Sequence, residues 1–496
     1  MNRDEMLLQL QQTQEWDIII IGGGATGLGA AVDAATRGYK TLLIEAFDFG
    51  KGTSSRSTKL VHGGVRYLAQ GNLKLVMEAL RERGYLLKNA PHLTTALSFV
   101  VPVYSWIEKM YYGIGLKIYD VLSGKLSLGK TRLLNKKETI DHLPGISKNS
   151  LKGGILYYDG QFDDARLAVE LAVTAAKHGA TVLNYCKAAA LVKNTGKITG
   201  VTIEDVVSKK IYEAKAKVVI NATGVFTDKV MQMDEPSDHN LVAPSQGIHL
   251  VVDKKFFPGS EAMMIPKTDD GRVLFAVPWH DKVVLGTTDT PVDEISCEPK
   301  PLEEEIEFVL HHANRYLEKN ILRSDVCSTF AGLRPLVQMK GAKSTALLSR
   351  DHTIIVSKSN LVTITGGKWT TYRKMAEDAV DNAVFIAKLA KKECVTKQLA
   401  IGNEAGAYVK EEGEKFIHES FNYTETDIKY FIQNEMAITV EDILARRTRL
   451  LFLDASAAIQ AALPVAKVMA LVMYKDEQWI NEQVNSFLQV ANNYKL

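Results

Sequence analysis

The chain has 496 residues, more than one hydrophobic core usually serves, so two or three domains are expected. A composition of 46% hydrophobic and 24% charged residues excludes a low-complexity or disordered chain. The formal net charge of +2 excludes a global field that would recruit nucleic acid, so anion binding must depend on local clusters.

Cysteine placement and the first residues of the chain indicate the compartment. Four cysteines lie far apart without a C-x-x-C pair, which argues against a zinc site or a disulfide framework, and we expect no metal. The N-terminal residues lack the charged-then-apolar order of a signal peptide. A cytoplasmic location is therefore the expectation.

The first elements of the chain form a predicted βαβ unit. Residues 17–21 place four isoleucines after an aspartate, which suits a parallel strand buried on both faces. Residues 25–37 predict an alanine-rich helix, and residues 41–44 predict a second strand that ends at Glu45.

The turn between this strand and helix satisfies G-x-G-x-x-G. The first glycine makes the turn, the second admits a pyrophosphate, and the third lets helix and strand pack closely. Glu45 follows at about the spacing of an acid that binds ribose hydroxyls, and its carboxylate disfavours the 2′-phosphate of NADP. The pattern alone is weak, but its position between strand and helix predicts dinucleotide binding. The predicted contacts are Gly22, Gly24, Ala25, Thr26, Gly27 and Glu45.

Later elements indicate two more domains. Residues 167–178 predict a second helix, and residues 180–185 and 218–221 predict strands of the same α/β domain. Between 247 and 289, strands joined by turn signals indicate an antiparallel sheet inserted in the first domain. Beyond about residue 391 the pattern becomes helical.

Two further small-residue turns after strands favour FAD over NAD. An extended cofactor needs close backbone approach at several places, whereas a nicotinamide-binding domain is usually one continuous block. The predicted contacts are Ala222, Thr223 and Gly224 in the first turn and Gly366, Gly367 and Lys368 in the second.

The stretch 53–68, TSSRSTKLVHGGVRYL, holds too many polar and glycine residues for a simple core element. It resembles the flavin-contacting segment of the FAD-dependent, aerobic, quinone-linked glycerol-3-phosphate dehydrogenases. The resemblance extends from about residue 17 to the C-terminus, and glycine- and amino-acid-oxidase-like flavoproteins share the implied fold. Further matching segments are 162–167, 286–289, 332–336 and 366–374.

The expected fold class is α/β. It combines a Rossmann-like FAD-binding domain of the glutathione-reductase and D-amino-acid-oxidase type with an inserted antiparallel-sheet substrate domain and a C-terminal helical domain. The expected boundaries are 15–90, 150–232 and 350–388 for the FAD-binding domain, 91–149 and 233–349 for the substrate-binding domain, and 389–496 for the helical domain.

The resemblance also implies an activity. The implied enzyme is cytoplasmic, docked peripherally on the inner face of the cell membrane. It oxidises glycerol 3-phosphate to dihydroxyacetone phosphate and passes the electrons to membrane quinone. Alternatives are an α-glycerophosphate oxidase that makes hydrogen peroxide, an amine or amino-acid oxidase of the same fold, and a flavin-holding subunit without its own substrate. Related oxidases often carry an extra insertion in the substrate region, which a chain of 496 residues hardly accommodates, and this favours the dehydrogenase. A homo-oligomer is left open.

Oxidation of a secondary alcohol needs a base for the hydroxyl proton and a group that stabilises a negative oxygen. His249 is the candidate base, with a satisfied histidine at a domain junction as the alternative. Arg334 is the candidate catalytic cation, aimed by the restricted backbone before Pro335, with a structural ion pair as the alternative. The resemblance places both side chains beside the flavin.

Recognition of a phosphate needs several converging donors. Of the candidates, Arg350 could instead pair with Asp351, and Lys368 could instead serve the carbonyl edge of the flavin. The predicted phosphate contacts are Arg66, Tyr67, Arg350 and Lys368.

Residues of the 53–68 stretch are predicted to contact the cofactor through polar side chains or through a glycine backbone close to the ring. Single hydroxyl residues could equally be turn formers. These predicted contacts are Thr53, Ser54, Ser55, Lys59, His62, Gly63 and Gly64.

Two basic segments are candidate surfaces for binding a partner. Residues 108–132 carry five basic and two acidic residues among tyrosines and aliphatic residues, a local balance of three positive charges. This segment could lie in an anionic membrane interface, but a helix packed on the substrate domain is favoured. Arg446, Arg447 and Arg449 are predicted to form a solvated helix face, and nucleic-acid binding is not predicted.

Overall fold

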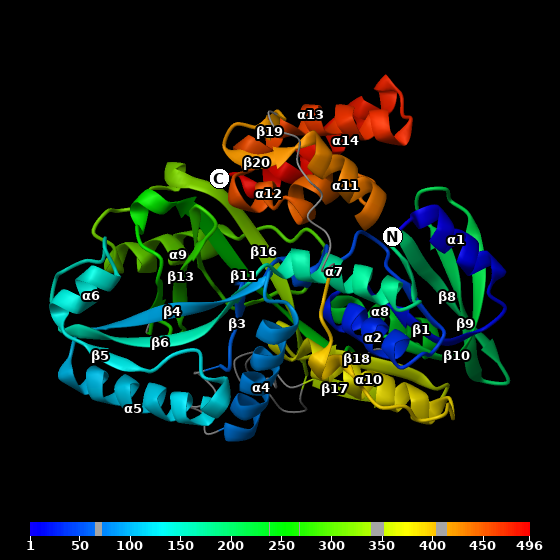
Figure 1. Cartoon of the computed structure of the whole chain (residues 1–496), viewed down its shortest axis with the longest axis horizontal. Coiled ribbons are helices and arrows are strands. Elements are labelled where there is room, and N and C mark those ends of the chain that lie inside the picture. The colour runs from blue at the N-terminus through cyan, green and yellow to red at the C-terminus, as the bar shows by residue number, and fades with distance from the viewer. Residues whose placement is uncertain (65–71, 238, 267, 339–351, 403–413) are drawn as a thin grey trace.

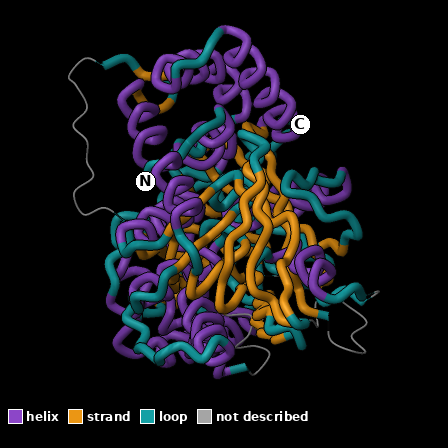
Figure 2. Tube along the Cα trace, turned by 90° about the vertical axis from the view of Figure 1, so that its right-hand side faces the viewer, coloured by secondary structure: helices purple, strands orange, loops and turns teal. Residues whose placement is uncertain are grey.

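The computed structural model describes residues 1–64, 72–237, 239–266, 268–338, 352–402 and 414–496. Two sheets lie side by side, and a helical C-terminal domain covers one end of both (Figure 1). A view turned by 90° places the C-terminal helices above the sheet strands (Figure 2). This arrangement brings segments far apart in the sequence to the boundary between the sheets.

Within the described residues the first sheet has eight strands, in the order β17-β18-β10-β1-β2-β7, with β9 pairing to β10 and β8 to β9. Pairing is parallel from β18 to β7, while β17 and the β8–β9 hairpin are antiparallel. Its strands are β1 (Trp16–Ile21), β2 (Thr41–Ile44), β7 (Thr181–Leu183), β8 (Cys186–Asn194), β9 (Lys197–Asp205), β10 (Ile211–Asn221), β17 (His352–Val356) and β18 (Leu361–Gly366). The isoleucines of β1 are buried because a parallel sheet is covered on both faces.

Helices cover this first sheet and bury its apolar faces. They are α1 (Arg3–Gln12), α2 (Ala25–Thr36), α7 (Asp164–Lys177), α8 (Thr227–Asp234) and α10 (Tyr372–Ile386). At the start of α2, a Cβ on Gly27 would lie 1.9 Å from the carbonyl oxygen of Gly22. Only glycine therefore allows α2 to pack this closely on the turn after β1.

The second sheet has ten strands, in the order β15-β11-β14-β13-β12-β4-β6-β3, with β16 pairing to β11 and β5 to β6. They are β3 (Leu60–Val61), β4 (Thr94–Val103), β5 (Arg132–Leu134), β6 (Gly153–Phe162), β11 (Val242–Asp253), β12 (Ala262–Ile265), β13 (Leu274–Trp279), β14 (Lys282–Gly286), β15 (Thr290–Pro291) and β16 (Val326–Val337). Its helices are α4 (Leu73–Asn89), α5 (Trp106–Ser123), α6 (Lys136–His142) and α9 (Glu303–Tyr316). Pairing is antiparallel apart from β4 with β12.

The C-terminal domain is built around α13, which packs against α11, α12 and α14. Its elements are β19 (Phe416–His418), β20 (Phe421–Thr424), α11 (Glu425–Glu435), a π-helical turn (Asp442–Arg447), α12 (Leu450–Leu453), α13 (Ala455–Met473) and α14 (Glu477–Ala491). Of the helices described, α13 has the length and hydropathy of a membrane span, but residues such as Ala458 and Val465 are buried in this domain. We interpret α13 as a core helix.

The predicted fold class is confirmed, with differences in detail. The helix expected at 167–178 begins at Asp164, because the side chain of Asp163 caps it. The strand β6 lies in the segment assigned to the FAD-binding domain, yet it pairs with β4 in the antiparallel sheet. The helix α1 precedes the first element that the sequence predicted.

The three C-terminal arginines correct another expectation. Arg446, Arg447 and Arg449 are each 1% exposed, so they do not form a solvated face. Arg446 and Arg447 both pair with the buried carboxylate of Asp48, which follows β2. This basic cluster therefore forms buried ion pairs, and those with Asp48 attach the C-terminal domain to the first sheet.

Candidate functional site

A cavity of about 250 Å³ lies where the two sheets meet. Five stretches far apart in the sequence line it, including β11, β13, β16 and the turn after β18. The lining residues are Thr53, Arg56, Ser57, Thr58, Leu60, His62, Gly247, His249, Phe275, Gly332, Arg334, Pro335, Leu336, Gly366, Gly367, Lys368, Trp369 and Thr370. The structure thus brings together His249, Arg334, Lys368, Thr53, His62 and the 366–367 glycines, as the sequence predicted.

The glycine-rich turn after β1 lies beside Glu45 at the end of β2. The Glu45 carboxylate accepts backbone hydrogen bonds from Gly23 at 2.6 Å and from Phe47 at 2.9 Å. Burial raises the pKa of Glu45, although these backbone donors act in the opposite direction. The acid therefore stands where the predicted dinucleotide would place its ribose.

The polar stretch after residue 52 joins this turn to the cavity. Ser54 Oγ accepts a hydrogen bond from the amide of Ala25 at 2.9 Å, at the start of α2. Thr53 donates to the carbonyl of Leu333 on β16 at 2.6 Å, and Trp369 Nε1 donates to the carbonyl of Ser54 at 2.8 Å. The stretch connects both sheets and the turn after β18.

The remaining small-residue turns differ in how closely they approach their neighbours. A Cβ on Gly22 would lie 2.6 Å from the carbonyl oxygen of Ala222, so the two turns come together only because position 22 lacks a side chain. A Cβ on Gly224 would meet no atom within 4 Å, so the turn beyond Thr223 opens onto free space. Gly63 and Gly64 are buried, and the amide of Gly63 donates to the Tyr119 hydroxyl at 2.7 Å.

These surfaces suit an extended dinucleotide with a ring system. The helix α2 directs its first amides toward the glycine turn, as in sites for pyrophosphate. Glu45 offers a ribose acceptor, and the 53–58 stretch, which contacts this turn through Ser54, also lines the cavity between the sheets. The residues present therefore fit FAD, held from β1 to the inter-sheet cavity.

His249 lies on β11 and is 2% exposed. Its Nε2 is 2.9 Å from the hydroxyl oxygen of Thr58, and its ring stacks on Phe330 with centroids 4.8 Å apart. Nδ1 is buried and has no hydrogen-bond partner among the described residues. Burial, Lys59 and Arg334 hold the pKa of His249 well below its usual value, so the imidazole is neutral near pH 7.

Arg334 lies on β16 opposite Ser245 of β11. Its guanidinium donates to the Thr287 hydroxyl at 3.1 Å and to the Thr288 carbonyl at 2.9 Å. It also lies 3.5 Å from Asp289, so the ion pair considered as an alternative is present. Nη1 also donates to the Gln246 carbonyl at 3.2 Å, and the side chain is 26% exposed in the cavity wall.

Two predicted cofactor contacts are corrected. Lys59 is fully enclosed by protein and pairs with Asp164 at 2.7 Å, so it cannot contact a cofactor. Ser55 is 1% exposed, and its hydroxyl donates to backbone carbonyls such as that of Gly52. Arg66, Tyr67 and Arg350 lie outside the described residues and remain predictions.

Several cavity residues were not singled out from the sequence. Thr58 and Arg56 belong to the polar stretch, but nothing in their spacing indicates that one would meet His249 or that the other would pair with Glu298. Phe275 comes from β13, and Trp369 follows the predicted 366–368 turn. Their position depends on the pairing of distant strands.

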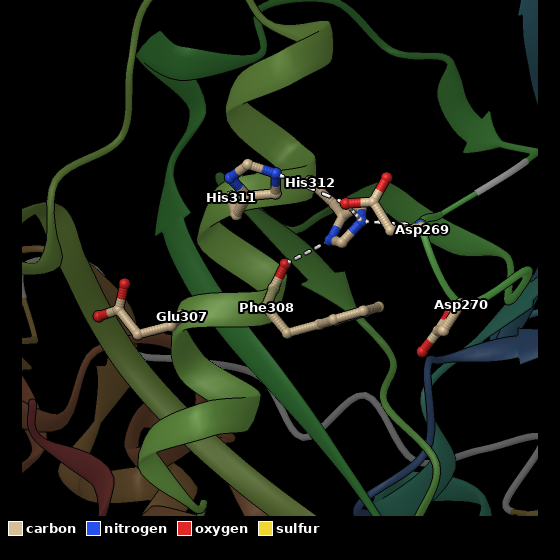
Figure 3. Close-up of a pocket in the computed structure, with 6 residues that line it drawn as sticks. All are labelled: Asp269, Asp270, Glu307, Phe308, His311 and His312. Atoms are coloured by element: carbon tan, nitrogen blue, oxygen red, sulfur yellow. Dashed lines mark hydrogen bonds and ion pairs between the residues drawn. The ribbon is translucent and has the colours of Figure 1, made fainter.

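A second, more open hollow lies between α9 and the turn at 268–272 (Figure 3). His312 Nδ1 donates to the Phe308 carbonyl at 2.8 Å, so Nε2 accepts from the amide of Asp269 at 3.0 Å. Nε2 thus holds the turn on the helix, while Nδ1 bonds within α9. In the described part of the chain no three His, Cys, Asp or Glu side chains gather as a metal site, and we assign this hollow a structural role.

Comparisons with known proteins agree with the geometry. Residues 17–373 match the family model described as FAD dependent oxidoreductase, and residues 362–479 match the C-terminal domain of alpha-glycerophosphate oxidase. A Homo sapiens protein named mitochondrial glycerol-3-phosphate dehydrogenase is 39% identical, and the match covers 100% of this chain and 76% of the human chain.

Solved structures give the same result. The glycerol-3-phosphate dehydrogenase from Bacillus halodurans complexed with FAD has a TM-score of 0.80 and 30% identity, covering 99% of this chain and 97% of that chain. The L-alpha-glycerophosphate oxidase from Mycoplasma pneumoniae shares the fold, with a TM-score of 0.58 at 16% identity over 78% of this chain and 98% of its own. FAD is the cofactor, as predicted, and the chain belongs to the family of FAD-dependent glycerol-3-phosphate dehydrogenases.

Proposed function

We propose that this protein oxidises sn-glycerol 3-phosphate to dihydroxyacetone phosphate and passes the electrons to membrane quinone. The observation that carries the proposal is a neutral imidazole and a fixed guanidinium in the wall of one cavity, in a chain that matches dehydrogenases of this name along its whole length. When bound, FAD supplies a two-electron acceptor for the hydride of the alcohol carbon.

Residues of the chain accept the proton, stabilise the negative oxygen and bind the phosphate. His249, neutral near pH 7, accepts the hydroxyl proton through the nitrogen that faces Thr58 and the cavity. Arg334 stabilises the oxygen as it gains negative charge, since its guanidinium is charged at all relevant pH values. Lys368 provides a positive charge in the wall of the same cavity, and Arg66, Tyr67 and Arg350 are the further predicted phosphate contacts.

The charge of the substrate phosphate also affects the proton affinity of His249. Burial, Lys59 and Arg334 disfavour an imidazolium at His249, which makes this side chain a poor proton acceptor in the free protein. A dianionic substrate in the cavity offsets these positive charges and raises the proton affinity of the imidazole. Proton uptake is thereby favoured when the substrate is present.

Quinone is the electron acceptor that we favour over oxygen. The curated relatives that match the full chain are named dehydrogenases, whereas the oxidase from Mycoplasma matches 78% of the chain at 16% identity. The C-terminal match is described by the name of an oxidase, and for this reason the acceptor needs a direct test.

The helix α5 is the surface that we propose lies on the membrane. It forms the edge of the molecule opposite the C-terminal domain (Figure 1). Its exposed face carries Trp106, Ile107, Met110, Tyr111, Ile114, Ile118 and Val121, and Ile107 is 81% exposed. Lys117, exposed on the same helix, would meet anionic headgroups of the inner membrane face. A cytoplasmic, peripheral location follows from this proposal.

The substrate is tested by anaerobic reduction of the bound flavin. Glycerol 3-phosphate should bleach the flavin absorbance within seconds, while glycerol, glycine and D-alanine at equal concentration should not. A flavin bleached by an amino acid and unchanged by glycerol 3-phosphate would overturn the proposal.

The acceptor and the membrane are tested separately. A water-soluble quinone should be reduced under argon, with little hydrogen peroxide formed in air, and the reverse ratio would identify an oxidase. The double variant Ile107→Asp, Ile114→Asp should lose sedimentation with vesicles containing phosphatidylglycerol. Val207→Asp, at an equally exposed position of the β9–β10 turn, is the matched control and should sediment like the wild type.

A further inference from the structure

The carboxylate of Asp164, in the first turn of α7, holds the backbone on both sides of Thr58. Its Oδ2 accepts hydrogen bonds from the amide of Ser57 at 3.1 Å, from the Ser57 hydroxyl at 2.7 Å and from Lys59 Nζ at 2.7 Å. Asp164 and Lys59 are fully buried. Ser57 and Lys59, the two neighbours of Thr58, therefore bind the same buried carboxylate, which fixes the position of Thr58 beside His249.

The same anchor is completed from the C-terminal domain. Arg449 Nη2 donates to Asp164 Oδ1 at 2.9 Å and to the carbonyl of Ser55 at 3.1 Å. The backbone of Arg449 has φ 64°, a left-handed conformation that costs free energy for a residue with a side chain. Tertiary contacts must stabilise this conformation, and the contacts to Asp164 and Ser55 are among them.

A second contact path reaches His249 from the opposite face. The Arg449 guanidinium lies 4.4 Å from the ring centroid of Phe452 on α12. Phe452 packs edge to face on Phe330 with centroids 4.9 Å apart, and Phe330 stacks on the imidazole of His249. The imidazole is thus supported through Thr58 on one side and through Phe330 on the other.

We propose that Arg449 of the C-terminal domain is a positioning residue for His249, acting through Asp164 and the Ser57–Thr58 backbone and through Phe452 and Phe330. The proposal rests on the proposed function, in which His249 receives the substrate proton. It gives the C-terminal domain a role in the reaction, although the matched oxidoreductase domain ends at residue 373.

Position matters because proton transfer to an imidazole requires close approach and alignment. A misplacement of about 1 Å by a distant substitution lowers a rate by about 100-fold. Substrate binding depends on cations from other elements, such as Lys368 after β18, and should be far less sensitive. A positioning role therefore separates the limiting rate of flavin reduction from the apparent substrate affinity.

The central experiment compares Arg449→Gln with Arg447→Gln in the FAD-loaded enzyme. Arg447 is equally buried and attaches the same domain through Asp48, and its described hydrogen bonds and ion pairs go to Asp48 and Glu435. Arg449→Gln should lower the limiting rate of anaerobic flavin reduction by about 10- to 100-fold with the half-saturating glycerol 3-phosphate concentration unchanged. Arg447→Gln should lower the melting temperature and retain that rate. Equal rate losses in the two variants would overturn the proposal.

A double-mutant cycle identifies the route. Thr58→Val removes the hydrogen bond to His249, and Thr58→Ser should restore it. If Arg449 acts through Thr58, then Thr58→Val combined with Arg449→Gln will be little slower than the slower single variant. Fully multiplicative losses would contradict the route. Arg449→Lys, which keeps a charge within reach of Asp164, replaces Arg449→Gln if that variant does not retain FAD.

A spectroscopic readout separates this proposal from the proposed function. In protein labelled with ¹⁵N-histidine, the His249 signals are assigned by their loss in His249→Asn. They should shift in Thr58→Val and Arg449→Gln and remain in place in Arg447→Gln. If glycerol 3-phosphate fails to reduce the wild-type flavin, the proposed function fails while this shift still tests the positioning. Unshifted signals in Arg449→Gln would overturn the inference.

Discussion

The carboxylate of Glu45 accepts a hydrogen bond from the amide of Gly23 at 2.6 Å, so the end of β2 holds the glycine turn that follows β1. A Cβ on Gly23 would lie 2.7 Å from the Cβ of Glu45. The two positions are in direct contact, so Glu45, the predicted ribose ligand, also fixes the turn that is predicted to receive the pyrophosphate.

Glu45→Gln should weaken FAD binding. The amide retains the shape of the side chain, but it loses the negative charge that strengthens hydrogen bonds to Gly23 and to a ribose hydroxyl, a loss of about 1–2 kcal/mol. We expect the dissociation constant for FAD to rise about 10-fold, measured by quenching of flavin fluorescence on titration of apoprotein. Glu213→Gln, at an exposed position of β10, is the control. An unchanged constant in Glu45→Gln would exclude Glu45 as a ribose ligand.

Arg334→Lys should slow flavin reduction while leaving FAD in place. Lysine keeps the charge but cannot reproduce the fork that donates to Thr287 and Thr288. We expect the limiting rate to fall by about 100-fold, because stabilisation of the developing oxygen charge depends on fixed geometry. Stopped-flow absorbance measures the rate. Arg315→Lys is the control, because Arg315 is half-exposed on α9, and its flavin should be reduced at the wild-type rate. A wild-type rate in Arg334→Lys would show that Arg334 has only a structural role.

Sequence patterns located the fold and much of the site, but not the contacts between domains. The isoleucine run of β1, the glycine turn and Glu45 are local signals, and the structure places them together as expected. The burial of Lys59 and Arg449 could not be read locally, because their partner Asp164 lies more than 100 residues from each of them. A basic residue in a polar stretch has the same local sequence signal whether it meets a ligand or a buried carboxylate.

His249 should define an acidic limit of activity below the usual histidine range. Its pKa is held well below the usual value by burial and by Lys59 and Arg334, so the neutral, proton-accepting form persists as pH falls through about 6.5. The rate of flavin reduction per molar substrate, measured from pH 5 to 8, should therefore show no loss attributable to this residue near pH 6.5. His249→Gln should lower the rate by about 100- to 1,000-fold at every pH. A wild-type limb at pH 6.5 that disappears in His249→Gln would contradict the assignment of its pKa.

Glu441 should make attachment of the C-terminal domain sensitive to acid. Its carboxylate lies 2.8 Å from Lys51 of the first sheet's domain and 2.7 Å from Arg446. Burial raises the pKa of Glu441, but Arg446 and Lys51 outweigh burial and leave the pKa below its ordinary value. A carboxyl group with a lowered pKa stabilises the folded state above its unfolded pKa of about 4.3. This contribution is lost as pH falls through the lowered folded value.

Glu441→Gln should therefore melt at a lower temperature than the wild type at pH 7, and the difference should shrink steadily as the pH is lowered below about 4.3. Differential scanning calorimetry from pH 7 to pH 3 measures both melting temperatures. Glu477→Gln, exposed on α14 of the same domain, should follow the wild-type curve. A constant difference between Glu441→Gln and the wild type over this range would show that the carboxylate does not ionise with a lowered pKa.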